Sequence, residues 1–111
     1  MILEFRTYRL KPGTSEDFVR VMREETVPLL RTAGLDVIDY GRSLVAEDGQ
    51  EEAYLIRAFP SLGEHERLER EFYGSEVWLR GPREAIVSRI ESYHTIVIET
   101  SEAAVEALRR R

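Results

Sequence analysis

The sequence predicts an α+β protein of the ferredoxin-like kind, in which a four-stranded antiparallel sheet carries helices on one face. Segments of strand-like and of helix-like pattern alternate in the order β-α-β-β-α-β, with an additional helical piece before the last strand. An Asp-Gly pair between the two middle strands is typical of a hairpin turn. The length of 111 residues suits one domain with its own core, predicted over residues 1–111.

The first strand is predicted over Ile2 to Leu10, and a helix follows it as far as Gly34, a common helix-ending residue. Pro28 lies within the helical pattern and lacks a backbone donor, so we expect a kink or a short break near Thr26-Val27. The apolar residues of this helix recur at helical spacing and form one buried stripe: Phe18, Val21, Met22, Leu29, Leu30 and Ala33.

Two strands are predicted next, over Leu35 to Ala46 and Glu52 to Phe59, on either side of the Asp-Gly turn. A helix then starts at Ser61, where a capping box is expected, and shorter helical pieces follow. The run from Tyr93 to Thr100 is rich in β-branched residues and indicates the fourth strand. Residues Ser101 to Arg110 can form a short terminal helix.

Alternation along the first strand divides its side chains between the two faces of the sheet. One set is Leu3, Phe5 and Thr7, and the other is Glu4, Arg6 and Tyr8. We expect the first set to pack under the helices. The second, half-polar set is expected to face a cavity, a subunit contact or water.

The helix-free face of the sheet is predicted to keep substantial apolar area, which indicates a homodimer. Strict alternation does not allow all of the following residues to lie on the helix side: Tyr8, Leu10, Tyr40, Leu44, Leu55, Phe59 and Val97. An exposed apolar patch above a few hundred Å² usually marks an interface or a ligand site. Two sheets packed face to face about a two-fold axis would bury this area and enclose a cavity. The alternative is a monomer with a wet, partly aromatic sheet face.

Composition excludes several classes of partner and chemistry. The formal net charge of −5 argues against nucleic acid as the main partner. No apolar run approaches the roughly 18–20 residues of a membrane span, so no membrane contact is predicted. The absence of cysteine removes disulfides and thiolate catalysis and is compatible with a reducing cytoplasm, where we expect the protein to reside.

The half-polar set of the first strand supplies the best candidates for a site. Arg6 can hold a carboxylate or an enolate, and Glu4 or Tyr8 can move a proton. Arg57 and Tyr40 can complete a cavity wall with Arg6 and Tyr8 that suits a small anionic or polar aromatic ligand. Two structural alternatives remain open: an ion pair within the first strand, and a pair between Arg57 and Glu4 across the sheet.

The two histidines are weaker candidates. His94 opens the last strand and can serve as a base that titrates near neutral pH, or it can be a surface or capping residue. His65 shares a helical stripe with Leu68 and Phe72, which favours a half-buried, hydrogen-bonded histidine over a haem ligand. Without cysteine or a grouped set of acidic residues, the sequence predicts no metal and no cofactor.

Several of these motifs make the chain similar to the NIPSNAP family of the dimeric α/β-barrel superfamily. Order and spacing match over nearly the whole chain. The motifs are Glu4-Phe5-Arg6-Thr7-Tyr8, Leu10-Lys11-Pro12-Gly13-Thr14, Pro28-Leu29, and the block from Ser61-Leu62 to Phe72-Tyr73-Gly74-Ser75-Glu76-Val77-Trp78. The resemblance implies a homodimer whose two sheets form a barrel around a central cavity. It implies no particular reaction, since the family has none that is securely established.

The wider superfamily includes cofactor-free monooxygenases, haem enzymes and plain dimerising modules. The chain contains no asparagine, which speaks against the Asn-Trp-His trio of haem-degrading members. The function we predict is therefore that of a NIPSNAP-like homodimer that binds a small organic ligand, anionic or aromatic, in its barrel cavity. The alternatives are a cofactor-independent monooxygenase or lyase, and a closed barrel that serves only for dimerisation.

Overall fold

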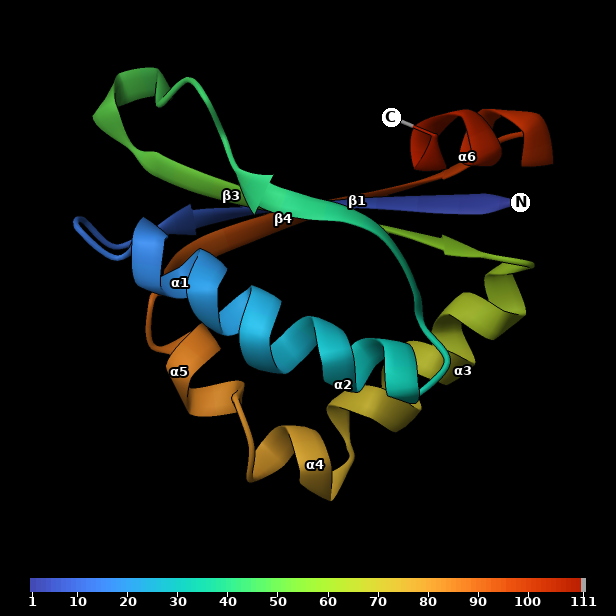
Figure 1. The fold of residues 1–111 in the computed structure, drawn as a ribbon, viewed down its shortest axis with the longest axis horizontal. Coiled ribbons are helices and arrows are strands. Elements are labelled where there is room, and N and C mark those ends of the chain that lie inside the picture. The colour runs from blue at the N-terminus through green and yellow to red at the C-terminus, as the bar shows by residue number, and fades with distance from the viewer. Residues whose placement is uncertain (111) are drawn as a thin grey trace.

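The computed structural model, which describes residues 1–110, contains the predicted antiparallel sheet of four strands in the order β2-β3-β1-β4 (Figure 1). The strands are β1 (Ile2–Leu10), β2 (Asp36–Arg42), β3 (Glu51–Phe59) and β4 (Ile90–Glu99). The first strand has the predicted limits. The second ends four residues earlier than expected, because the chain leaves the sheet at Ser43 and forms a longer connection to β3.

Five α-helices cover one face of the sheet, and a sixth lies on the other face (Figure 1). They are α1 (Ser15–Val21), α2 (Val27–Thr32), α3 (Leu62–Tyr73), α4 (Glu76–Leu79), α5 (Arg83–Val87) and, on the opposite face, α6 (Glu102–Arg109). The predicted cap of α3 is present, since Ser61 accepts from the Glu64 N–H at 3.2 Å, and Ser101 caps α6 in the same way by accepting from the Ala104 N–H at 3.1 Å.

The first helix is interrupted where Pro28 predicts it. The π-helical turn η1 (Met22–Thr26) separates α1 from α2, and the N–H of Val27 bonds to the carbonyl of Met22, five residues back. Proline cannot donate the next helical hydrogen bond, so the wider turn absorbs the mismatch just before it. Gly34, with φ of +91°, then ends the helix in the left-handed region that glycine adopts without strain.

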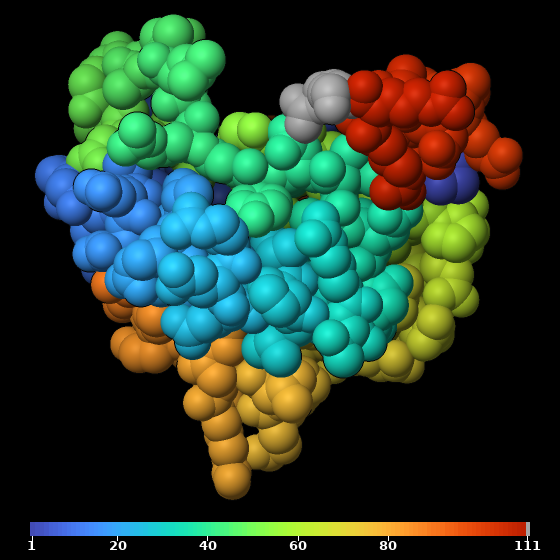
Figure 2. Space-filling model, in the orientation of Figure 1, coloured from blue at the N-terminus to red at the C-terminus, as the bar shows by residue number. Residues whose placement is uncertain are grey.

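The Asp-Gly pair makes the turn between β2 and β3, within the short 3₁₀ turn η2 (Glu47–Gly49). Asp48 and Gly49 both have positive φ, 57° and 72°, which Asp and Gly tolerate best. This connection rises on the same side of the sheet as α6, and a hollow lies between the two (Figure 2).

The structure reverses the predicted faces of β1. The set containing Glu4, Arg6 and Tyr8 points toward the helices, where the Tyr8 ring lies 5.1 Å from that of Phe18. Leu3 and Phe5 point the other way. Alternation correctly shows which residues share a face, but it does not show which face the helices cover.

Most of the apolar residues that were expected not to fit together on the helix side do lie there. Tyr8, Leu10, Leu55 and Phe59 are buried in the helix-side core, and Tyr40 packs against that core. They can all lie on one face because the strands pair in a register that places them there together. Val97 of β4 pairs with Glu4 and also points to the helix side, whereas Leu44 is exposed in the β2–β3 connection, outside the sheet.

The open face has a small apolar cluster of its own, in which Leu3 and Ala58 pack against Val105 of α6. The helix covers only part of this face. Ile96 and Ile98 of the edge strand β4 remain 49% and 40% exposed. Among residues 1–110, no helix is long and apolar enough to cross a membrane.

Candidate functional site

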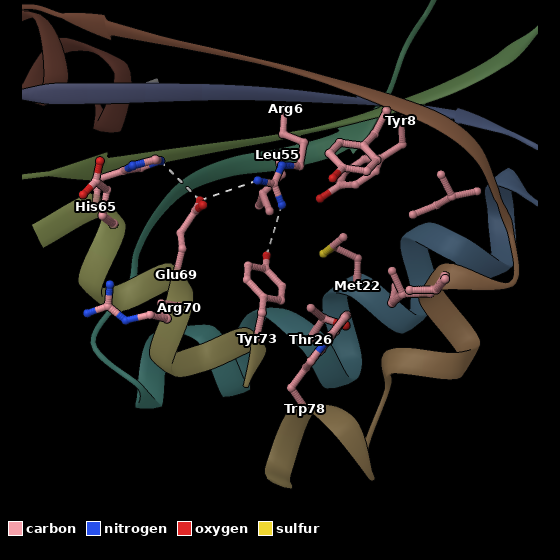
Figure 3. Close-up of a pocket in the computed structure, with 15 residues that line it drawn as sticks. Arg6, Tyr8, Met22, Thr26, Leu55, His65, Glu69, Arg70, Tyr73 and Trp78 are labelled. Carbon is pink, nitrogen blue, oxygen red and sulfur yellow. Dashed lines mark hydrogen bonds and ion pairs between the residues drawn. The ribbon is translucent and has the colours of Figure 1, made fainter. Parts of the chain in front are cut away.

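A cavity of about 670 Å³ lies between the sheet and the helices of the one chain (Figure 3). Its polar side is formed by residues of β1 and α3, and its apolar side by η1, α4 and α5. The lining residues are Arg6, Tyr8, Met22, Thr26, Leu55, His65, Glu66, Glu69, Arg70, Tyr73, Trp78, Ile86, Val87, Ile90 and Tyr93. The cavity is therefore on the opposite side of the sheet from the barrel interior that the sequence led us to expect.

A buried ion pair anchors the polar side of the cavity. Glu4 of β1 and Arg57 of β3 lie opposite each other in the strand register, and both are fully buried. The Arg57 Nε donates to Glu4 Oε1 at 3.0 Å, and its Nη2 contacts both carboxylate oxygens, Oε2 at 3.0 Å. The cross-sheet pair left open as an alternative for Arg57 is therefore present. Arg57 lies on the same helix-covered face as Arg6, because its neighbours Ile56 and Ala58 face away from the helices.

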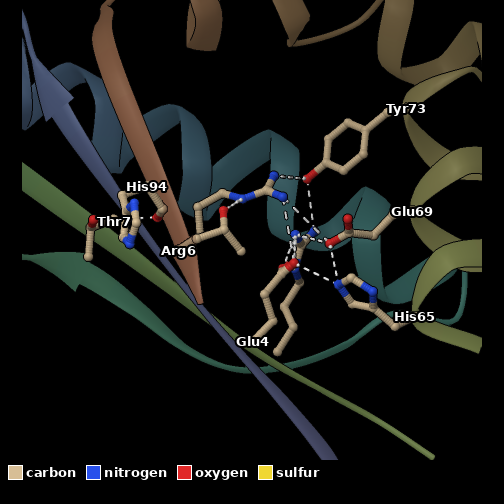
Figure 4. Close-up of polar contacts among 9 residues, drawn as sticks. Glu4, Arg6, Thr7, His65, Glu69, Tyr73 and His94 are labelled. Atoms are coloured by element: carbon tan, nitrogen blue, oxygen red, sulfur yellow. Dashed lines mark hydrogen bonds and ion pairs between the residues drawn. The ribbon is translucent and has the colours of Figure 1, made fainter. Parts of the chain in front are cut away.

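Helix α3 supplies three further members of this polar cluster. His65, Glu69 and Tyr73 follow one another at spacings of four residues, which places them on one side of the helix, facing the sheet (Figure 4). Arg57 donates to Glu69 at 2.7 Å and to the Tyr73 hydroxyl at 2.8 Å. The His65 Nε2 lies 3.2 Å from Glu4 and 3.4 Å from Glu69.

Sequence reasoning missed Glu69 as a site residue and did not place Tyr73 in a polar cluster. The stripe of His65 with Leu68 and Phe72 was recognised, and it does face the core. The polar stripe beside it carries the signal that was overlooked: three ionisable or phenolic side chains at i, i+4 and i+8 of one helix.

Arg6 is held more loosely than Arg57. Its Nε donates to Thr95 at 3.0 Å, but its Nη atoms lie 3.4 Å from the Tyr73 hydroxyl and 3.6 Å from Glu4 and from Glu69. The rings of Tyr93 and Tyr73 lie 5.4 Å and 5.7 Å from its guanidinium. Arg6 lines the cavity, whereas Arg57 lies behind it with all of its nitrogens bonded.

The two carboxyl groups of the cluster have different proton affinities. Burial, and next the hydrogen bond with Glu4, raise the pKa of Glu69. The Arg57 guanidinium lowers it by less, so the pKa of Glu69 is about 7. For Glu4, burial alone would raise the pKa, but the hydrogen bond with Glu69 and the guanidinium groups of Arg57 and Arg6 lower it to about 2. At neutral pH Glu4 is therefore a fixed anion, while Glu69 exchanges its proton.

The other predicted site residues lie in three different environments. Tyr8 lines the cavity, and burial raises the pKa of its phenol, so it stays protonated. Tyr40 packs at the core outside the cavity lining. His94 lies opposite Thr7 on the other face of the sheet, away from the polar cluster (Figure 4). The structure thus brings Arg6 and Tyr8 together and separates them from His94.

The cluster also contains three groups of the kind that bind metal ions. Ligand atoms of Glu4, His65 and Glu69 all lie within 4.8 Å of one another. A cation there would have to displace the guanidinium of Arg57, which bonds to both carboxylates, and would lie near that of Arg6. The chemistry of this donor set does not fit a resident metal, and we assign none.

Comparison with solved structures shows the fold. A NIPSNAP family protein with unknown function from Agrobacterium tumefaciens is 24% identical with a TM-score of 0.80, over 91% of this chain and 88% of that one. An uncharacterised NIPSNAP domain protein from Burkholderia xenovorans is 14% identical with a TM-score of 0.79, over 92% and 96% of the two chains. The fold is also that of antibiotic biosynthesis monooxygenases: a putative one from Nitrosomonas europaea is 14% identical with a TM-score of 0.65, over 90% and 98%.

No match was found among curated proteins. The NIPSNAP family model matches residues 3–102, which include β2, β3 and β4, all of β1 except its first residue, and the whole polar cluster. The chain belongs to the NIPSNAP family.

Proposed function

We propose that this protein binds a small organic anion with an aromatic or otherwise apolar body in the cavity between its sheet and its helices. The observation that carries the proposal is the two-sided lining of one cavity. Trp78, Ile86 and Met22 offer an apolar surface, and Arg6 offers a guanidinium beside it. Such a combination fixes the orientation of a ligand that has one charged end.

Arg6 is the residue best suited to hold the charged group. Among residues 1–110, the Arg6 Nη atoms have no bonding partner closer than 3.4 Å, so they can turn to a ligand carboxylate without breaking a strong contact. Arg57 cannot do this, because its donors are already used by Glu4, Glu69 and Tyr73. The predicted ligand role of Arg57 thus becomes one of support.

Two phenols supplement Arg6. The Tyr73 oxygen accepts hydrogen bonds from both arginines, at 2.8 Å and 3.4 Å, so its own O–H is left for another acceptor. Tyr8 is a second protonated phenol on the cavity wall. A guanidinium and two phenolic donors form a suitable environment for a carboxylate or an enolate oxygen.

The test measures binding of a panel of aromatic carboxylates and phenols by isothermal titration calorimetry. Arg6→Ala removes the cavity guanidinium, and Arg9→Ala is the matched control, because Arg9 follows on the same strand and is exposed. We expect Arg6→Ala to bind at least about tenfold more weakly, the value of one charged hydrogen bond, and Arg9→Ala to bind as the wild type does. Equal affinity in both variants, or no binding by the wild type, contradicts the proposal.

Catalysis without a cofactor is the second candidate function. Two observations favour it over simple binding: the fold shared with proteins described as antibiotic biosynthesis monooxygenases, and a cavity carboxyl, Glu69, that titrates near neutral pH. A monooxygenase would consume oxygen together with a bound phenol, whereas a lyase would not. Oxygen uptake measured with the ligands that bind separates these two reactions.

We also propose that a second copy of the chain covers the open face of the sheet. Phe5, Ile56, Ile96 and Ile98 leave an apolar area there beside α6, and the hollow between α6 and the β2–β3 connection can receive a partner (Figure 2). Sedimentation at micromolar concentration tests this, and a single subunit contradicts it. The cytoplasmic location expected from the cysteine-free composition stays a prediction.

A further inference from the structure

The carboxyl groups of Glu4 and Glu69 are bound unequally by the same arginine. Glu4 is fully buried and receives both the Nε and the Nη2 of Arg57. Glu69 receives one strong bond, from Nη2 at 2.7 Å, and its side chain is 18% exposed at the cavity. Arg57 therefore fixes Glu4 completely and leaves part of the Glu69 carboxyl accessible to a ligand.

The surroundings of Glu69 raise its pKa, whereas those of Glu4 lower the pKa of that carboxyl. The charged and titratable groups that face it are Glu4 and Arg6 from β1, Arg57 from β3, and His65 and Tyr73 from α3 itself. The result is a pKa of about 7 for Glu69 and about 2 for Glu4. Two carboxyls whose pKa values are driven apart in one site are typical of an anion that stays fixed and a partner that carries the proton.

The base candidates expected from the sequence fit this task less well. Glu4 is buried and ion-paired, so it has little tendency to take up a proton. Tyr8 stays protonated because burial raises its pKa. His94 lies on the other face of the sheet. Glu69 offers a carboxyl group that lines the cavity and lies beside Arg6, at 3.6 Å.

We propose that Glu69 is the proton-transfer residue of this cavity and that the substrate is a carbon acid, a small 2-oxo acid with hydrogen on the carbon next to its carbonyl group. The proposal rests on the proposed function, because Arg6 has to hold the ligand for Glu69 to reach it. A carboxylate and an adjacent carbonyl match the guanidinium and the phenolic donors on the polar side of the cavity.

The step balances without any further reactant. Ionised Glu69 takes a proton from the carbon, the electron pair of that C–H bond forms a carbon–carbon double bond, and the carbonyl electron pair moves onto oxygen. The enolate oxygen accepts hydrogen bonds from the Arg6 guanidinium and the Tyr73 hydroxyl, which are positioned before the charge develops. Return of the proton restores the ketone. The observable reaction is exchange of the carbon-bound hydrogen with solvent.

The experiment follows loss of the C3 hydrogen signal of phenylpyruvate in deuterated buffer by NMR. Phenylpyruvate combines a carboxylate, an enolisable carbon and an aromatic body that fits the apolar side of the cavity. Glu69→Gln removes the base with almost no change in shape. Glu71→Gln is the matched control, because Glu71 lies on the same helix but is exposed and outside the cavity lining.

We expect the wild type to exchange phenylpyruvate faster than buffer alone, with a rate that rises with pH and levels off above about 7. Glu69→Gln should lower the exchange rate by about 100-fold or more, which is the usual contribution of a positioned base, and abolish the rise with pH. Glu71→Gln should stay within about twofold of the wild type, because Glu71 does not line the cavity.

A separate calorimetric titration with phenylpyruvate distinguishes the two levels of the proposal. If the wild type binds phenylpyruvate but exchanges it no faster than buffer, or if Glu69→Gln exchanges as fast as the wild type, the role of Glu69 is overturned and cavity binding stands. If the wild type binds no aromatic carboxylate at all, the proposed function fails and this inference fails with it. Should Glu69→Gln not fold, Glu69→Asp must keep the pH-dependent rise at a reduced rate.

Discussion

The two faces of this sheet differ in what they bury: the covered face holds an ion pair inside the main apolar core, whereas the other face leaves apolar side chains partly exposed. The face covered by α1 to α5 contains the fully buried pair Glu4 and Arg57, whereas the face left partly open carries Phe5, Ile96 and Ile98. The covered face tolerates charge because each donor of Arg57 meets an acceptor. The open face keeps apolar side chains that α6 does not cover. The comparison shows that a charged side chain can be buried in this core when each of its polar groups has a hydrogen-bond or ion-pair partner.

The strongest test of the covered face is removal of Arg57. Arg57→Ala leaves the Glu4 carboxylate buried without its main partner, and we expect the free energy of unfolding to fall by about 3–5 kcal/mol at pH 7. Urea denaturation measures this change. Arg9→Ala is the control on the same sheet: its pair with Glu52, at 3.7 Å, is exposed, so its loss should cost less than about 1 kcal/mol. Similar small losses in both variants would show that the buried pair is not needed for stability.

The fold was largely predictable because the signals that define it are local. Pro28 predicts the break in the first helix, Asp48-Gly49 predicts the turn between β2 and β3, and Ser61 predicts the start of α3. The assignment of faces failed because the apolar residues of β1 and of its neighbour β3 together decide which face the helices cover. One face of β1 has charged residues at its middle and apolar residues at its ends, namely Ile2, Tyr8 and Leu10. It becomes recognisable as the core face only when the strand register places Leu55 and Phe59 of β3 on the same face.

The candidate site was predictable in part, for a related reason. Glu4, Arg6 and Arg57 are conspicuous because charged residues inside strands need an explanation. Glu69 is not conspicuous, since it is one of several glutamates on a strongly charged helix. Only the register between α3 and the sheet distinguishes it from exposed Glu66 and Glu71, and that register is a tertiary property.

The pH dependence of stability sharpens the comparison within the polar cluster. The pKa of Glu69 is about 7 in the folded chain, against an ordinary value of 4.5, so between these pH values the folded state holds a proton that the unfolded state has lost. Stability contributed by this group is present below pH 4.5 and is lost as the pH rises to about 7. The loss amounts to no more than about 3 kcal/mol.

Urea titrations at pH values between 4.5 and 7.5 measure this loss. Glu69→Gln cannot bind or release the proton, so its stability should change less over the same range, while Glu66→Gln should follow the wild type. Glu4 affects stability in the opposite sense and at lower pH. Because its pKa is lowered, the stability that it contributes is lost as the pH drops from 4.5 toward 2. Parallel curves for the wild type and Glu69→Gln would exclude the raised pKa.

A smaller effect is expected at Thr26, in the π-helical turn. Its side chain is 3% exposed and lines the cavity, and its hydroxyl has no hydrogen-bond partner among residues 1–110. Thr26→Val keeps the shape and removes the unpaired group, so we expect a gain of about 1 kcal/mol in the free energy of unfolding. Thr95→Val is the control, because the Thr95 hydroxyl accepts from Arg6 at 3.0 Å and its removal should bring no gain. A loss of stability in Thr26→Val would show that its hydroxyl is bonded.

The smallest change in the stability of the subunit is expected from a substitution on the open face of the sheet. The same substitution is expected to have the largest effect on dimer formation. Ile96 and Val97 are neighbours on β4 that point to opposite faces of the sheet and are 49% and 38% exposed. Ile96→Lys places a charge in the apolar area assigned to a second copy, and Val97→Lys places the same charge on the helix side. Because both sites are partly exposed, each substitution should change the free energy of unfolding of the isolated subunit by only about 0.5 kcal/mol.

Sedimentation velocity at micromolar concentration should therefore separate these neighbours by assembly alone. We expect the wild type and Val97→Lys to sediment as dimers and Ile96→Lys as a folded single subunit, since a lysine ammonium cannot be desolvated against an apolar partner without a counter-charge. Dissociation of Val97→Lys together with a dimeric Ile96→Lys would mean that the chains associate through the helix-side edge of β4.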